Sequence, residues 1–110
     1  IYLSGLSNGG MGSFELLKHR PNMFASAVII CGGGNPAWAK EFAKSTPVWI
    51  AHGSNDKVVK PDFSLKMVEA IINEGGSPKV TFFENVYHNS WDYVFSDAKY
   101  LKWMYSRSKN

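Results

Sequence analysis

Strand-length apolar runs alternate with segments of helical periodicity along the whole chain. The candidate strands are residues 1–3, 26–31, 47–51 and 79–84. The candidate helices extend from the residues after Ser7 to the stop at Pro21, over 36–44, over 61–73 and from 91 to 104. The run at 26–31 is almost continuously apolar, which is typical of a strand covered on both faces. The alternation therefore predicts an α/β fold with about four parallel strands and flanking helices.

Size and composition limit the classes of protein to consider. A chain of 110 residues forms one domain at most, and 45% hydrophobic with 19% charged residues is ordinary for a globular protein. The net charge is only +3 and the lysines and arginines form no sustained basic run, so we expect no nucleic-acid partner. No stretch approaches the ~20 apolar residues of a membrane span, so we expect no membrane partner.

The first candidate site is the G-x-S-x-G pattern of residues 5–9, centred on Ser7. Gly5 and Gly9 would remove side chains that collide where the chain turns sharply from strand to helix around the serine. At such a turn the free N–H of Asn8 could stabilise an oxyanion. A plain Gly-rich turn is the alternative. The apolar run before Ser7 and the helix after it favour a nucleophile.

A serine nucleophile needs a base, and the base needs a carboxylate that orients it. Ser7, Asp56 and His88 all follow predicted strands, and the loops after parallel strands gather at one edge of the sheet. Their chain order, Ser then Asp then His, is the order expected of α/β-hydrolases. Asp is also common in turns for local hydrogen bonds alone. The shared edge favours a catalytic triad.

The other polar candidates have simpler interpretations. We expect His19 to be solvated in the last turn of the first helix, and His52 to be a structural residue of the turn after its strand. A hydrogen bond from His52 that supports the site is the alternative. Asp62 and Asp92 stand where helices begin, which favours capping or solvent contact. Cys31 cannot form an internal disulfide and is expected to be a small buried residue.

Three segments, residues 5–10, 52–59 and 88–92, resemble motifs of the C-terminal half of α/β-hydrolases. The similarity is greatest to the branch of feruloyl and acetylxylan esterases, polyhydroxybutyrate depolymerases and dienelactone-hydrolase-like or prolyl-oligopeptidase-like enzymes. It implies that residues 1–110 form a partial α/β-hydrolase domain, without the N-terminal strands and oxyanion loop of the family. We therefore expect a second chain carrying the N-terminal half, or self-association through the open sheet edge at residues 1–3.

The resemblance also assigns roles. Ser7 would be the nucleophile, Asp56 the acid, His88 the general base and acid, and the Asn8 amide one oxyanion donor. The implied reaction is hydrolysis of a carboxylic ester through an acyl-enzyme, with acetyl or feruloyl esters on polysaccharide as candidate substrates. It implies neither a cofactor nor a metal, and activity would require the N-terminal half.

The substrate pocket is less well defined by the sequence. Its candidate walls are Met11, Gly33, Val58 and Trp91. A prolyl-oligopeptidase-like serine peptidase and a non-catalytic fragment that assembles with another chain are the alternatives to an esterase. The resemblance slightly favours a secreted or periplasmic protein, although one unpaired cysteine is also compatible with the cytoplasm.

Overall fold

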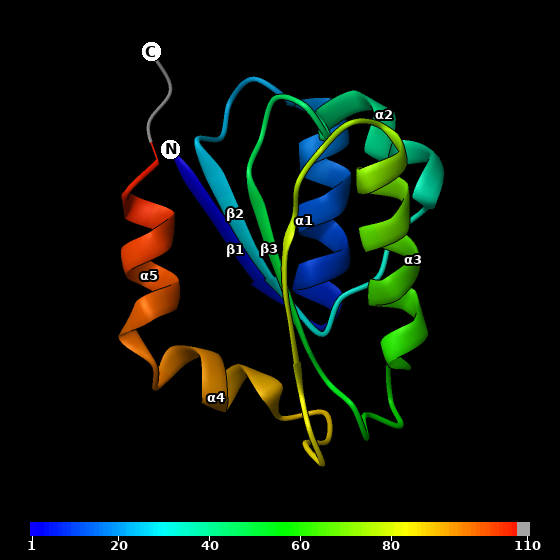
Figure 1. The fold of residues 1–110 in the computed structure, drawn as a ribbon, viewed down its shortest axis with the longest axis vertical. Helices are drawn as coiled ribbons and strands as arrows, with labels where there is room; N and C mark the ends of the chain where they lie inside the picture. The colour runs from blue at the N-terminus through cyan, green and yellow to red at the C-terminus, as the bar shows by residue number, and fades with distance from the viewer. Residues whose placement is uncertain (108–110) are drawn as a thin grey trace.

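The computed structural model describes residues 1–107, which form a parallel sheet with helices on both faces (Figure 1). The sheet has four strands in the order β1-β2-β3-β4, and each neighbouring pair is parallel. The strands are β1 (Tyr2–Leu6), β2 (Ser26–Ile30), β3 (Val48–Gly53) and β4 (Lys79–Phe83). The predicted α/β fold with four parallel strands is confirmed.

The helices are divided between the two faces of this sheet (Figure 1). Three of them, α1, α2 and α3, cover one face, while α4 and α5 cover the other. Their bounds are α1 (Asn8–His19), α2 (Ala39–Phe42), which directly follows the 3₁₀ turn η1 (Pro36–Trp38), α3 (Pro61–Asn73), α4 (Ser90–Phe95) and α5 (Ala98–Tyr105). No helix within residues 1–107 has the length and apolar character that crossing a bilayer requires.

Strand β2 shows why the sheet needs two helical layers. All five of its residues are buried. Ala27 and Ile29 pack into the core under α1, α2 and α3, whereas Val28 and Ile30 pack into the core under α4 and α5. Alternate side chains of a strand point to opposite faces, so an apolar strand without polar alternation must be covered twice.

The structure corrects the prediction for the end of the chain. The apolar spacing from 91 to 104 predicted one helix, but α4 ends at Phe95 and α5 begins at Ala98. Asp97 lies between them in an extended conformation, and its side chain accepts a hydrogen bond from the Lys99 amide at 3.0 Å. Asp caps a helix start better than it continues a helix, because its carboxylate binds nearby backbone N–H groups.

Two smaller differences lie at other elements. The predicted strand at 1–3 extends as far as Leu6, so β1 reaches the residue before Ser7. The predicted helix over 36–44 is a 3₁₀ turn followed by a single α-helical turn. β1 is an edge strand that pairs only with β2 within the described part of the chain.

Candidate active site

Ser7 occupies a strained turn between β1 and α1. Its φ of 51° and ψ of −119° lie outside the regions that L-residues prefer, and such conformations cost about 1–3 kcal/mol each. Two backbone hydrogen bonds hold the turn: the Ser7 amide donates to the Ile30 carbonyl at 2.9 Å, and the Met11 amide donates to the Ser7 carbonyl at 3.1 Å. Strain of this kind is maintained where the surrounding structure fixes the backbone.

The glycines on either side of Ser7 differ in their importance. A Cβ on Gly5 would lie 2.3 Å from the Gly9 carbonyl oxygen and 2.3 Å from the Ser13 Oγ, so no side chain fits there. A Cβ on Gly9 would meet nothing within 4 Å. The prediction that both glycines avoid a collision is therefore right for Gly5 and wrong for Gly9.

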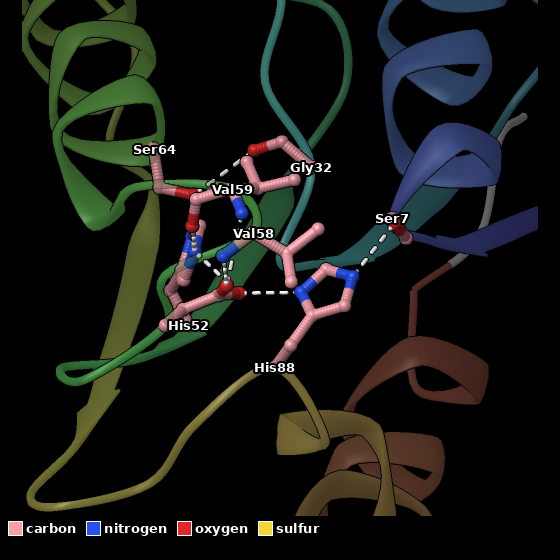
Figure 2. A network of polar contacts seen from close by, with 8 residues as sticks. Ser7, Gly32, His52, Val58, Val59, Ser64 and His88 are labelled. Carbon is pink, nitrogen blue, oxygen red and sulfur yellow. Dashed lines mark hydrogen bonds and ion pairs between the residues drawn. The ribbon is translucent and has the colours of Figure 1, made fainter.

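The loops after three strands bring Ser7, Asp56 and His88 together (Figure 2). The Ser7 Oγ lies 3.0 Å from the His88 Nε2, and the His88 Nδ1 lies 2.6 Å from the Asp56 Oδ2. Since a carboxylate only accepts, the Nδ1–H of His88 donates to Asp56 and leaves Nε2 free to accept from the serine hydroxyl. This tautomer is the one that a general base requires.

The Asp56 carboxylate is buried but has several donors. Its Oδ1 accepts hydrogen bonds from the amides of Val58 and Val59, both at 2.9 Å. Burial opposes ionisation, but the hydrogen bonds from His88, Val59 and Val58 outweigh it, and the pKa of Asp56 is lowered from its ordinary value. The group therefore remains a carboxylate, which is the form that holds the His88 ring.

The prediction that His52 lies in a turn is wrong, because β3 continues to Gly53. Its ring is fully buried, with Nε2 2.7 Å from the Val59 carbonyl oxygen and 3.2 Å from the Asp56 Oδ2. Burial is the main reason that the pKa of His52 is lowered, and the nearby Val59 carbonyl and Asp56 only partly oppose it. His52 therefore contacts the acid as a neutral ring.

Cys31 lies beneath the same site. It is buried with a φ of 44°, and burial raises the pKa of its thiol above the ordinary value. Its Sγ and one ligand atom each of Asp56 and His88 all lie within 4.8 Å of one another. A metal ion bound there would have to take a thiol whose pKa burial raises.

An apolar pocket of about 350 Å³ lies beside Ser7 and Asp56. It adjoins the site because Met11 is one helical turn from Ser7, and the amide of Val58 binds Asp56. The pocket is lined by Met11, Gly33, Gly34, Asn35, Trp38, Val58, Val59 and Phe63.

Three of the four predicted walls, Met11, Gly33 and Val58, line this pocket. Trp91 does not; its ring stands edge-on to that of His88, with centroids 5.2 Å apart. The aromatic walls are Trp38 and Phe63, which were not among the walls predicted from the sequence. Helical spacing identified them as apolar positions but could not show that they face an open pocket.

Asn8 is the first residue of α1, so its amide N–H has no acceptor within the helix. It directly follows Ser7, where the sequence predicted an oxyanion donor. His19 ends α1, and Asp62 and Asp92 lie in the first turns of α3 and α4. None of these last three belongs to the group around Ser7.

Comparison with solved structures identifies the fold. A thermostable esterase superposes with a TM-score of 0.92 and 29% sequence identity, over 98% of this chain and 31% of that chain. The chain has an α/β-hydrolase fold. An acylaminoacyl peptidase shares this fold at a TM-score of 0.69 with 16% identity, over 82% of this chain and 20% of that chain.

The curated proteins add one relative of this α/β-hydrolase chain. A bifunctional acetylxylan esterase/xylanase of Neocallimastix patriciarum is 36% identical over 59 residues, which is 54% of this chain and 9% of that protein. No family model matches the chain. The chain thus spans about a third or less of these three proteins.

Proposed function

We propose that this chain provides the catalytic triad of a serine hydrolase that cleaves carboxylic esters. The observation that carries the proposal is the continuous set of contacts from Ser7 through His88 to Asp56, at 3.0 and 2.6 Å. The similarity to the thermostable esterase supports the same reaction class. Because the chain spans only part of those proteins, the activity is proposed for the whole protein in which it acts.

Each member of the triad has one task in this mechanism. The Ser7 oxygen attacks the ester carbonyl carbon while His88 Nε2 takes its proton. The protonated ring, held by Asp56, then gives that proton to the departing alcohol and leaves an acyl-Ser7 ester. Water attacks the acyl group with His88 again as the base, the acid is released, and the serine regains its proton.

The tetrahedral intermediate needs hydrogen-bond donors for its oxyanion. The amide N–H of Asn8 is the proposed first donor, since it adjoins Ser7 and has no helical acceptor. A second donor from the N-terminal oxyanion loop, which the family resemblance implies, is part of the same proposal. Removing one such donor costs about 10²–10³-fold in turnover, so the arrangement of the whole protein decides the rate.

The pocket favours an ester with a sizeable apolar group. Its volume of about 350 Å³ exceeds what an acetyl group needs, and Trp38 and Phe63 offer flat aromatic walls. Met11, Val58 and Phe63 are exposed apolar side chains that line this pocket together, and a contiguous exposed apolar surface often marks a ligand-binding groove. We therefore favour a feruloyl-like aryl ester over an acetyl ester on polysaccharide.

A peptidase is the second candidate, because an acylaminoacyl peptidase shares the fold. The two candidates differ in the leaving group that His88 must protonate. Comparing turnover of phenyl esters with that of peptide anilides separates them: a clear preference for the anilide would replace the esterase proposal.

Assembly is a further part of the proposal. The edge strand β1 presents backbone groups that can pair with another strand, and Ile1, just before the strand, and Tyr2, its first residue, are exposed. We propose that this edge pairs with a segment carrying the N-terminal half of the domain, or with a second copy of the chain. Light scattering on a dilute sample tests this, and a stable monomer of this chain alone would contradict it.

The decisive experiment on the function is mass spectrometry of the intact protein after treatment with a fluorophosphonate. The sample is used as purified, with every chain that accompanies it. One adduct that maps to Ser7 and is lost in Ser7→Ala is the expected result. A folded protein without an adduct would support the alternative of a non-catalytic piece that assembles with another chain.

A further inference from the structure

We propose that His52 is a positioning residue, which fixes the Asp56 carboxylate from the side opposite His88. The inference rests on the proposed function, in which Asp56 is the acid of the triad. It concerns a residue that takes no part in the proton transfers themselves. Figure 2 shows the surrounding network, in which His52 and Ser64 lie on the side of Val58 and Val59 that is away from His88.

One nitrogen of His52 acts on the acid loop in two ways. Its Nε2–H donates to the Val59 carbonyl at 2.7 Å, and the amide of the same Val59 donates to the Asp56 Oδ1 at 2.9 Å. The Asp56 Oδ2 also lies 3.2 Å from this Nε2. His52 therefore fixes the loop that holds Oδ1 and at the same time places a partly positive N–H next to Oδ2, the atom that His88 uses.

The other nitrogen of His52 is fixed by α3. The Ser64 Oγ lies 2.6 Å from Nδ1 and 3.0 Å from the Gly32 carbonyl oxygen, and both side chains are fully buried. With the ring proton on Nε2, Nδ1 must accept, so the single hydroxyl proton of Ser64 is shared between Nδ1, at the shorter distance, and the Gly32 carbonyl. Phe82 stacks on the ring at a centroid distance of 6.4 Å. The ring therefore has few alternative orientations.

The network also reaches the element that carries the nucleophile. Gly32, which contacts Ser64, packs so closely on α1 that an added Cβ would lie 2.8 Å from the Gly10 Cα. The position of Asp56 relative to α1, the helix that begins after Ser7, is thus fixed by residues from β3, from α3 and from the loop after β2. A displacement of about 1 Å in such a site can cost about 10²-fold in rate.

A purely structural role for His52 is the competing explanation. An apolar ring would fill the same space, so packing alone does not require two nitrogens with three polar contacts, two of them to the acid loop. Ser26 offers a matched case without that connection: it is fully buried and donates to the Met104 carbonyl at 2.8 Å, on the other side of the sheet. Its loss should affect stability alone.

The test is a double-mutant cycle in the protein as purified with all of its chains. Ester hydrolysis is measured for wild type, His52→Phe, Asp56→Asn and the combination, with His52→Gln as the conservative variant and Ser26→Ala as the control. We expect His52→Phe to lower kcat by about 10- to 100-fold with KM nearly unchanged. His52→Gln, which can still donate to Val59, should recover most of this loss. In the Asp56→Asn background, His52→Phe should cost little, because it acts through that residue.

A second readout does not depend on turnover. The Nδ1 proton of His88, hydrogen-bonded to Asp56, should give a far-downfield proton NMR signal. We expect this signal in wild type and in Ser26→Ala. In His52→Phe it should move or vanish, and in Ser64→Ala it should change to a smaller extent. The positioning role would be overturned if the losses in kcat of His52→Phe and Asp56→Asn multiply in the double variant, or if the NMR signal is unchanged in folded His52→Phe. If wild type itself hydrolyses no ester, the proposed function fails, and the NMR signal alone decides the role of His52.

Discussion

The Nδ1 atom of His88 lies 2.6 Å from the Oδ2 atom of Asp56, so its proton is committed to the carboxylate. The other ring nitrogen is then an acceptor, and it faces the Ser7 hydroxyl at 3.0 Å. This single contact therefore fixes the tautomer on which the proposed chemistry depends.

Replacing Asp56 with asparagine tests that dependence directly. An amide can present its N–H₂ to His88 Nδ1, which stabilises the tautomer with the proton on Nε2 and removes the acceptor for Ser7. We expect Asp56→Asn to lower kcat by about 10⁴-fold while the fold is retained. Asp62→Asn is the matched control, since Asp62 is exposed in the first turn of α3. Equal activity of the two variants, measured on an ester substrate, would contradict the assignment.

The pH dependence of stability should reflect His52. Its folded-state pKa is lowered from the ordinary value of 6.5, so below about pH 6.5 the unfolded chain binds a proton at this site that the folded chain does not. The free energy of unfolding should therefore fall as the pH decreases from 6.5, and no such loss from His52 occurs above it. Urea unfolding of wild type and His52→Gln at pH 8, 6 and 5 measures this. The variant should lose less stability than wild type over that range.

Ionisation of Asp56 should also make the free energy of unfolding fall with decreasing pH, but at lower pH than for His52. Its pKa is lowered from 3.8, so the stability that its ionised form gives is fully present above that value and is lost as the pH falls below it. The same unfolding series extended to pH 3 should show a further loss in wild type that is smaller in Asp56→Asn. Parallel curves for the two proteins would indicate that Asp56 titrates normally in the folded state.

The two glycines of the Ser7 turn form a natural pair for substitution. Gly5→Ala would place a Cβ against the backbone of Gly9, so we expect a loss of about 1–3 kcal/mol in the free energy of unfolding and a loss of fluorophosphonate labelling at Ser7. Gly9→Ala has open space in a helix, and replacing a helical glycine by alanine should stabilise by up to about 1 kcal/mol. Thermal unfolding and labelling of both variants check this, and similar effects at the two positions would show that the turn is not sterically restricted.

The sheet and the meeting of Ser7, Asp56 and His88 could be predicted because they follow from one rule. Parallel strands end at the same edge, so polar loops after three strands are neighbours whatever their separation in sequence. The burial of Cys31 and the two-sided cover of β2 also followed from an apolar run without alternation.

The remaining features could not be predicted, because they depend on side chains that compete for nearby backbone groups, or on the directions in which side chains point, which a single sequence does not show. The break at Asp97 was missed because apolar spacing continues across it, while one carboxylate that accepts from the Lys99 amide caps the start of a new helix. His52 was placed in a turn because it precedes Gly53 and other turn-forming residues, and its contacts with Ser64 and Val59 depend on side-chain positions in the folded chain. The spacing of Phe63 showed an apolar face but not that this face opens onto a pocket.

The pocket next to Ser7 should discriminate between aryl and acetyl esters through Phe63. Its ring forms one wall of the apolar pocket, whereas an acetyl group is too small to reach across a volume of about 350 Å³. We expect Phe63→Ala to lower kcat/KM for a feruloyl ester by roughly 10-fold and to leave that for an acetyl ester nearly unchanged, because only the larger acyl group loses contact area. Phe95→Ala is the matched control, as Phe95 is also about half exposed but ends α4 on the other face of the sheet. Steady-state kinetics on both esters measure the ratio. An equal loss on the two substrates would place Phe63 in the support of the triad instead of the substrate pocket.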